Sequence, residues 1–158
     1  MKIFVGADYR GFDKKERLMR ALVADGYEVM DAGAFQYTEG DDYNDPAVLV
    51  AQSVRGDVGA GVGDASEGAL GVLICDSAHG MTIQANRFRG VRAANCDSAE
   101  SARLAREHDD ANVVCLSAHF MDDGQILEIV RSFIETPFEP LERRIRRIRR
   151  LDEREDYA

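Results

Sequence analysis

One thiol in this sequence stands among groups that are suited to proton transfer. Cys75 ends the apolar run "ALGVLIC". An acid, a hydroxyl and a histidine follow it closely, namely Asp76, Ser77 and His79. A thiol acts as a base or nucleophile when its pKa is lowered, and a helix N-terminus does this. Asp76 opposes it, because a neighbouring carboxylate raises a thiol pKa. Since a free cysteine is also a common core residue, position alone leaves both interpretations open.

The elements around Cys75 follow an alternating pattern. Five apolar runs, at 2–7, 27–33, 69–75, 90–96 and 112–118, are separated by segments of helical period. This alternation predicts parallel strands joined by helical crossovers that cover both faces of the sheet. We expect an α/β fold, a three-layer αβα sandwich with a five-stranded parallel sheet of Rossmann-like or flavodoxin-like type.

Such a sheet predicts where a ligand binds. Ligands of open parallel sheets bind beyond the carboxyl ends of the strands, where the strand order reverses. In the flavodoxin-like order this crevice lies between the first and third strands. Asp8 and Tyr9 follow the first strand, and Cys75 ends the third. Helix N-termini follow both turns, and their free amides favour an anion or a developing oxyanion.

Two segments rich in Gly and Asp, at 35–46 and 56–68, are predicted to be loops. The second contains glycines at 59, 61 and 63 but lacks the G-x-G-x-x-G spacing, and it precedes a strand instead of opening a helix. The context of a nucleotide-binding loop is therefore missing, and we interpret the segment as a flexible connection.

The C-terminal segment, at about 138–155, predicts an amphipathic helix. Apolar residues recur at helical spacing and leave arginines on the other faces. The apolar residues are Leu141, Ile145, Ile148 and Leu151, and the arginines are Arg143, Arg144, Arg146, Arg147, Arg149 and Arg150. The arginines either form a solvated face paired with nearby acids or include one or two that bind a phosphate or carboxylate.

Composition bounds the possible functions. The 158 residues fit one domain, 1–158, and the formal net charge of -9 disfavours nucleic acid and anionic membranes as partners. Three separated cysteines suggest neither a disulfide framework nor a zinc ribbon. The sequence shows no signal-type or membrane-length apolar segment, so we expect a cytoplasmic protein.

Several segments resemble one family. They are "MKIFVGADYRGFDKKERL", "DYNDPA", "GVLICDSAHGMTIQANR", "GVRAA" and "LAREHDDANVVCLSA", followed by the arginine-bearing tail. In this order they are similar to the type B ribose-5-phosphate isomerases and galactose-6-phosphate isomerase subunits. The resemblance covers nearly the whole chain, and its most specific parts are the segment around Cys75 and "REHDDAN".

The resemblance implies an aldose–ketose isomerase that needs no metal or cofactor and acts on a sugar phosphate through an enediolate. Ribose 5-phosphate is the default substrate, in carbohydrate metabolism and the pentose phosphate pathway. By the same resemblance Cys75 is the base, and Ser77 helps the loop amides to hold the enediolate oxygens. His108 and Asp8 assist opening of the furanose ring. These roles match general base catalysis with preorganised donors.

The resemblance also implies a set of substrate-binding positions, several of which carry unusual residues here. Tyr9 and His119 replace a histidine and an arginine that contact phosphate in the family. The remaining positions are Asp76, Ala78, His79, Gly80, Asp109, Arg143 and Arg147. Glycines are usual at 76 and 78. A tetrose or hexose phosphate is therefore an alternative substrate, and a phosphate-binding or nucleotide-binding module without turnover is an alternative function.

His108 adds an expectation about assembly. It precedes the fifth strand, which in a flavodoxin-like sheet lies at the edge opposite Asp8 and Cys75. A catalytic His108 therefore has to come from a second subunit, so we expect a homodimer with sites at the interface. The C-terminal helix is expected to pack on the partner, and pairing of dimers is left open.

Overall fold

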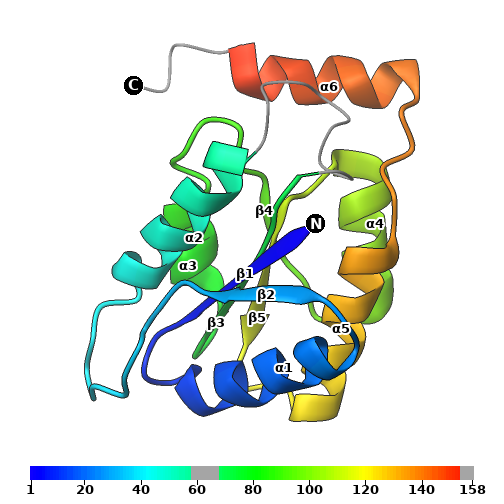
Figure 1. Ribbon diagram of the computed structural model, residues 1–158. Coiled ribbons are helices and arrows are strands. Elements are labelled where there is room, and N and C mark those ends of the chain that lie inside the picture. The colour runs from blue at the N-terminus through cyan, green and yellow to red at the C-terminus, as the bar shows by residue number, and fades with distance from the viewer. Residues whose placement is uncertain (58–67, 154–158) are drawn as a thin grey trace.

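The computed structural model describes residues 1–57 and 68–153. Their strands form one sheet in the order β2-β1-β3-β5-β4, with every neighbouring pair parallel (Figure 1). The strands are β1 (Lys2–Ala7), β2 (Glu28–Asp31), β3 (Leu70–Cys75), β4 (Ala93–Asn95) and β5 (Val113–Ser117). The predicted α/β fold with a five-stranded parallel sheet is confirmed.

Helices cover both faces of this sheet. They are α1 (Phe12–Ala24), α2 (Asn44–Asp57), α3 (His79–Ala85), α4 (Ala99–Asp109), α5 (Asp123–Glu135) and α6 (Glu142–Glu153). Apolar side chains of α1, α4 and α5 share one core with the sheet, and those of α2 and α3 share the other. Within the described residues, every helix is too short or too polar to span a lipid bilayer.

The strand order differs from the flavodoxin-like 2-1-3-4-5, because β5 lies between β3 and β4. The crevice between β1 and β3 is unaffected by this exchange. The neighbour of β3 on its other side is now β5, and Cys75 is paired with Ser117 at the carboxyl ends of the two strands. Three strand ends therefore meet at the predicted site.

The turn after β1 packs tightly against the end of β3. A Cβ atom built on Gly11 would lie 2.2 Å from the carbonyl oxygen of Ile74, a distance that no side chain tolerates. Gly11 is thus required for the close approach of the two chain segments. This approach brings Asp8, three residues before Gly11, to the side of Cys75.

The C-terminal helix is shorter than predicted. It begins at Glu142 rather than near 138, since the chain leaves α5 in an extended conformation at Thr136 and passes Pro140. Residues 154–158 lie outside the described part, as do the glycines at 59, 61 and 63. The helix α6 crosses the molecule at the top of Figure 1, where Arg144 donates a hydrogen bond to the carbonyl oxygen of Glu107 in α4.

Candidate active site

Cys75 and Asp8 lie together at the carboxyl ends of β3 and β1. Cys75 is 5% exposed and its side chain packs on the α2 and α3 side, with Ala78 and Met81. Asp8 is 6% exposed, and its carboxylate accepts a hydrogen bond of 3.1 Å from the backbone N–H of Gly11. The tight turn that Gly11 permits brings the two side chains together, as the sequence predicts.

The two groups disfavour each other's charged forms. Burial raises the pKa of Cys75, and the charge of Asp8 raises it further. The backbone N–H groups of Ala78, Met81 and Ser77 act in the opposite direction and lower this pKa. Burial likewise raises the pKa of Asp8. The carboxylate that opposes the thiolate is therefore Asp8, whereas the sequence had suggested Asp76.

Asp76 points elsewhere. Its carboxylate lies 3.6 Å from Nδ1 of His119, and both side chains are largely exposed. The other unusual histidine, His79, is the first residue of α3, and its Nδ1 lies 2.9 Å from the Nδ2 atom of Asn95, at the end of β4. Two histidines thus lie at the carboxyl end of the sheet, on the side of β4 and β5.

The turn between Cys75 and α3 is strained at Ala78. This residue has φ of 67° and ψ of -17°, in the left-handed region that glycine adopts freely. The structure explains why glycine is usual at position 78 in the resembling family. Ala78 keeps the turn geometry, so the amide arrangement is present at an energetic cost.

Ala78→Gly should stabilise the protein modestly. An L-residue in the left-handed region costs about 1–2 kcal/mol, and glycine removes this strain. The greater entropy of glycine in the unfolded chain offsets about 0.5–1 kcal/mol of that gain. Urea unfolding should show a small increase in the free energy of unfolding. Ala105→Gly, inside α4, is the matched control and should destabilise by about 1 kcal/mol. Equal losses from both substitutions would contradict strain at Ala78.

The structure adds residues that sequence reasoning missed. Ser117 Oγ donates a 2.6 Å hydrogen bond to the carbonyl oxygen of Asp76. Asp41 accepts a hydrogen bond of 2.9 Å from the backbone N–H of Tyr9. The ring of Tyr43 lies over Gly80, where an added Cβ would come within 2.6 Å of it. Ser117 stands at a strand end like Cys75, and the same rule would have found it had the strand order been known.

His108 and Asp109 lie at the other end of the sheet. They end α4, which leads into the amino end of β5. The paired row of Cys75 and Ser117 is four residues from that of Gly71 and Val113, so about 13 Å of strand separates the two ends. His108 is remote because it is at the amino end. The expectation that it lies at the far edge of the sheet was wrong, since β5 is next to β3.

The arginines of α6 are also at this amino end. Arg144 is buried and forms ion pairs with Glu139 and Glu107. Arg143 and Arg147 are exposed, and in the described part of the chain they form no ion pair or hydrogen bond. Their i, i+4 spacing places them on one face of the helix.

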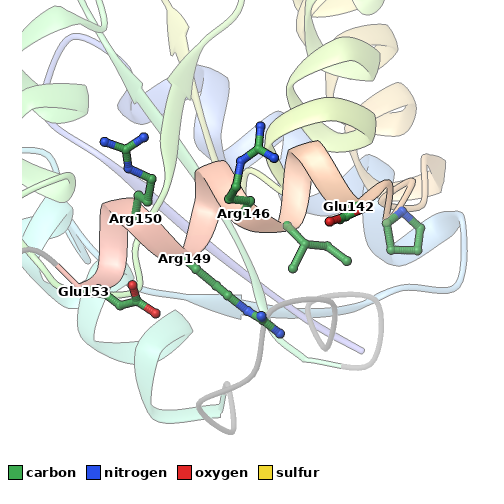
Figure 2. Close-up of a pocket in the computed structure, with 7 residues that line it drawn as sticks. Glu142, Arg146, Arg149, Arg150 and Glu153 are labelled. Carbon is green, nitrogen blue, oxygen red and sulfur yellow. The ribbon is translucent and has the colours of Figure 1, made fainter.

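A second set of arginines borders a shallow groove of about 490 Å³ along α6. Figure 2 shows Arg146 and Arg150 on one side of the helix and Arg149 on the other, with Glu142 and Glu153 at the two ends. These acids temper the positive charge of the groove. Arg144 is occupied by its two ion pairs, so the other arginines of α6 are the ones that can bind an external anion.

No metal site is found in the described residues, where no three His, Cys, Asp or Glu side chains gather closely enough to hold an ion. The side chains present at the carboxyl end supply a thiol, a carboxylate and backbone amides. This set can move a proton and stabilise a negative charge that develops on a substrate oxygen.

Comparisons with known proteins agree with this chemistry. A sequence model of the family described as Ribose/Galactose Isomerase matches residues 3–151. The ribose-5-phosphate isomerase B of Mycobacterium tuberculosis is 35% identical over 98% of this chain and 90% of its own. A Clostridium protein named 4-deoxy-4-sulfo-D-erythrose isomerase is 30% identical over 87% of this chain and 81% of its own.

A solved structure shows the same similarity in three dimensions. Ribose-5-phosphate isomerase B from Mycoplasma genitalium, with bound ribulose 5-phosphate, superposes with a TM-score of 0.88 at 36% identity. The match covers 99% of this chain and 97% of the other.

Proposed function

The chain belongs to the ribose/galactose isomerase family, and we propose that it is an aldose–ketose isomerase that interconverts ribose 5-phosphate and ribulose 5-phosphate. The observation that carries this proposal is the position of Cys75, buried at the end of β3 beside Asp8 and three backbone amides. Binding of phosphate alone requires neither a thiol nor a carboxylate, and the family membership favours turnover.

Cys75 acts as the base in this proposal. Its thiolate removes the proton from C2 of the open-chain aldose, and the electron pair forms the C1–C2 double bond of an enediolate. The same thiol then gives the proton to C1, and the hydroxyl proton of C2 passes to the oxygen on C1, which gives the ketose and restores the thiolate. The Ser77 hydroxyl and the amides of the Ser77–Gly80 turn meet the negative charge on the enediolate oxygens.

Completion of the site requires a second subunit. Cys75 and Asp8 are at the carboxyl end of the sheet, whereas His108 and Asp109 are at the amino end of the same chain. A symmetric homodimer that faces one end against the other brings both sets together twice. In that arrangement His108 of one chain and Asp8 of the other handle the protons of furanose ring opening.

The phosphate is bound by the same partner in this proposal. The charges of Asp41 and Asp76 act on Asp8 beside Cys75, and these carboxylates repel a phosphate. Arg143 and Arg147 are exposed and unpaired within the described residues, so both are free to bind it. Arginine suits this role because its planar fork matches phosphate oxygens.

A substrate assay tests the proposal. Ribose 5-phosphate is mixed with the protein and formation of ribulose 5-phosphate is followed by NMR, with erythrose 4-phosphate, 4-deoxy-4-sulfo-D-erythrose, a hexose 6-phosphate and free ribose in parallel. We expect ribose 5-phosphate to be isomerised and free ribose not. Turnover of a tetrose or hexose alone would make that sugar the substrate, and the unusual residues Tyr9 and His119 would then account for the change. No turnover of any compound would contradict an isomerase.

Asp8→Asn should increase ionisation of the Cys75 thiol and at the same time lower turnover. The charge of Asp8 raises the pKa of Cys75, so a neutral amide lowers that pKa and increases the thiolate fraction at neutral pH. Alkylation by iodoacetamide at pH 7 should become faster while isomerisation slows, because ring opening loses its carboxylate. Asp123→Asn is the control, because Asp123 pairs with Arg17 and its charge is not among those that shift the pKa of Cys75. An unchanged alkylation rate in Asp8→Asn would contradict the repulsion between the two groups.

We also propose a cytoplasmic location. The three cysteines, Cys75, Cys96 and Cys115, are free and buried. A protein whose base is a free thiol suits a reducing compartment.

A further inference from the structure

Ser117 lies beside Cys75 in the sheet, and the proposed reaction gives it no role. Its side chain is 3% exposed, and its hydroxyl donates the 2.6 Å hydrogen bond to the carbonyl oxygen of Asp76. The same hydroxyl oxygen accepts hydrogen bonds from the backbone N–H groups of His119, at 3.2 Å, and Phe120, at 3.1 Å. One donor and two acceptor positions are therefore all used, which fixes the hydroxyl in one orientation.

The carbonyl that Ser117 holds belongs to the peptide group shared by Asp76 and Ser77. A trans peptide group is planar, so its C=O and its N–H point in opposite directions and turn together. The N–H of Ser77 is one of the amides that lower the pKa of Cys75. Holding the Asp76 carbonyl therefore also holds the direction in which the Ser77 N–H points.

Backbone hydrogen bonds keep the two strand ends together without the hydroxyl. The carbonyl of Cys75 accepts from the N–H of Ala118 at 2.8 Å, and that of Asp76 accepts from the N–H of His119 at 3.1 Å. Removal of the hydroxyl leaves both bonds in place. The turn should then remain folded, while the Asp76 carbonyl loses the shorter of its two hydrogen bonds, so the Asp76–Ser77 peptide group is held less firmly.

We propose that Ser117 is a positioning residue, whose hydroxyl aligns the Asp76–Ser77 peptide group so that the Ser77 N–H meets the negative charge on the Cys75 sulfur and on the enediolate. The enediolate half rests on the proposed function, whereas the effect on the thiolate requires no substrate. Among the described residues, two other titratable groups interact with Cys75. Asp8 lies at the end of β1, and Cys115 lies on β5, where burial raises its pKa to about 12. Replacing Ser117 changes neither.

The test compares Ser117→Ala with Ser132→Ala. Ser132 is the matched control, because its hydroxyl also donates to a backbone carbonyl, that of Ala99 at 2.7 Å, but far from Cys75 on α5. The rate of Cys75 alkylation by iodoacetamide is measured against pH, and kcat and KM for ribose 5-phosphate are measured separately. Ser117→Thr keeps the hydroxyl and serves as the rescue variant.

We expect Ser117→Ala to raise the pH midpoint of alkylation and to lower kcat by up to about tenfold with KM nearly unchanged, since about tenfold is the effect of losing one hydrogen bond to a charged group completely. Ser132→Ala should leave both unchanged, and Ser117→Thr should restore them. Identical alkylation profiles for Ser117→Ala and wild type would overturn the inference even if stability falls. If the wild type isomerises nothing, the proposed function fails, and the alkylation profile still decides the role of Ser117.

Discussion

Cys75→Ala is expected to lower kcat for ribose 5-phosphate by about a thousandfold, in the middle of the range for loss of a general base. In the proposed reaction the substitution removes the group that takes the proton from C2, and the described residues offer no second thiol at the end of β3. Asp8 is the nearest carboxylate, but it serves the ring oxygens in the proposed reaction. The variant should fold, since alanine fits the space of the thiol.

Cys96→Ala is the matched control for this experiment. Cys96 is also a buried free thiol, but it packs in the core formed with α1, α4 and α5. Its loss should change stability and leave kcat near that of the wild type. Substantial turnover by Cys75→Ala, with a circular dichroism spectrum like the wild type, would contradict the role of Cys75 as the base.

His108→Ala is expected to lower turnover of ribose 5-phosphate by about a hundredfold, because in the proposed reaction ring opening loses its acid–base group. His108 is partly exposed at the end of α4, where its Nε2 lies 3.2 Å from a carboxylate oxygen of Glu107. Removing it costs little packing, so the fold should be intact. Arg131→Ala, on α5, removes a surface ion pair with Asp25 and should leave kcat unchanged. Wild-type turnover by His108→Ala would contradict its catalytic role.

The sequence predicted the elements well because apolar periodicity reports which side chains face a core. The run 2–7 matches β1, and the runs 69–75 and 112–118 contain β3 and β5. The order of the strands was predicted wrongly. Periodicity shows that a strand exists but does not show which strand lies beside it.

Burial of the strands contained the missing information. All five residues of β5 are buried, as expected of a central strand covered on both faces. The three residues of β4 are half-buried or exposed, as expected of an edge strand. "NVVCLSA" is the more continuous apolar run, so a comparison with "GVRAANC" would have placed β5 inside and predicted Ser117 at the site.

Asp8 and the strained Ala78 illustrate the limits of local sequence. Asp76 is adjacent to Cys75 in the chain, but its side chain turns toward His119, and Asp8 is the carboxylate that opposes the thiolate. Asp8 lies beside Cys75 because the tight turn at Gly11 brings the ends of β1 and β3 together. The left-handed conformation of Ala78 likewise follows from the geometry of the turn, because alanine itself gives no sign of it.

Mixing the Cys75→Ala and His108→Ala proteins tests the central claim most directly, that each site joins Cys75 of one chain to His108 of another. After subunit exchange, half of the dimers are mixed, and each mixed dimer has one site with both residues intact. The mixture should therefore recover about a quarter of the wild-type activity, although each variant alone is nearly inactive. Formation of mixed dimers is confirmed by native mass spectrometry with a mass tag on one variant. Mixed dimers with no activity above that of the separate variants would contradict a site shared between subunits.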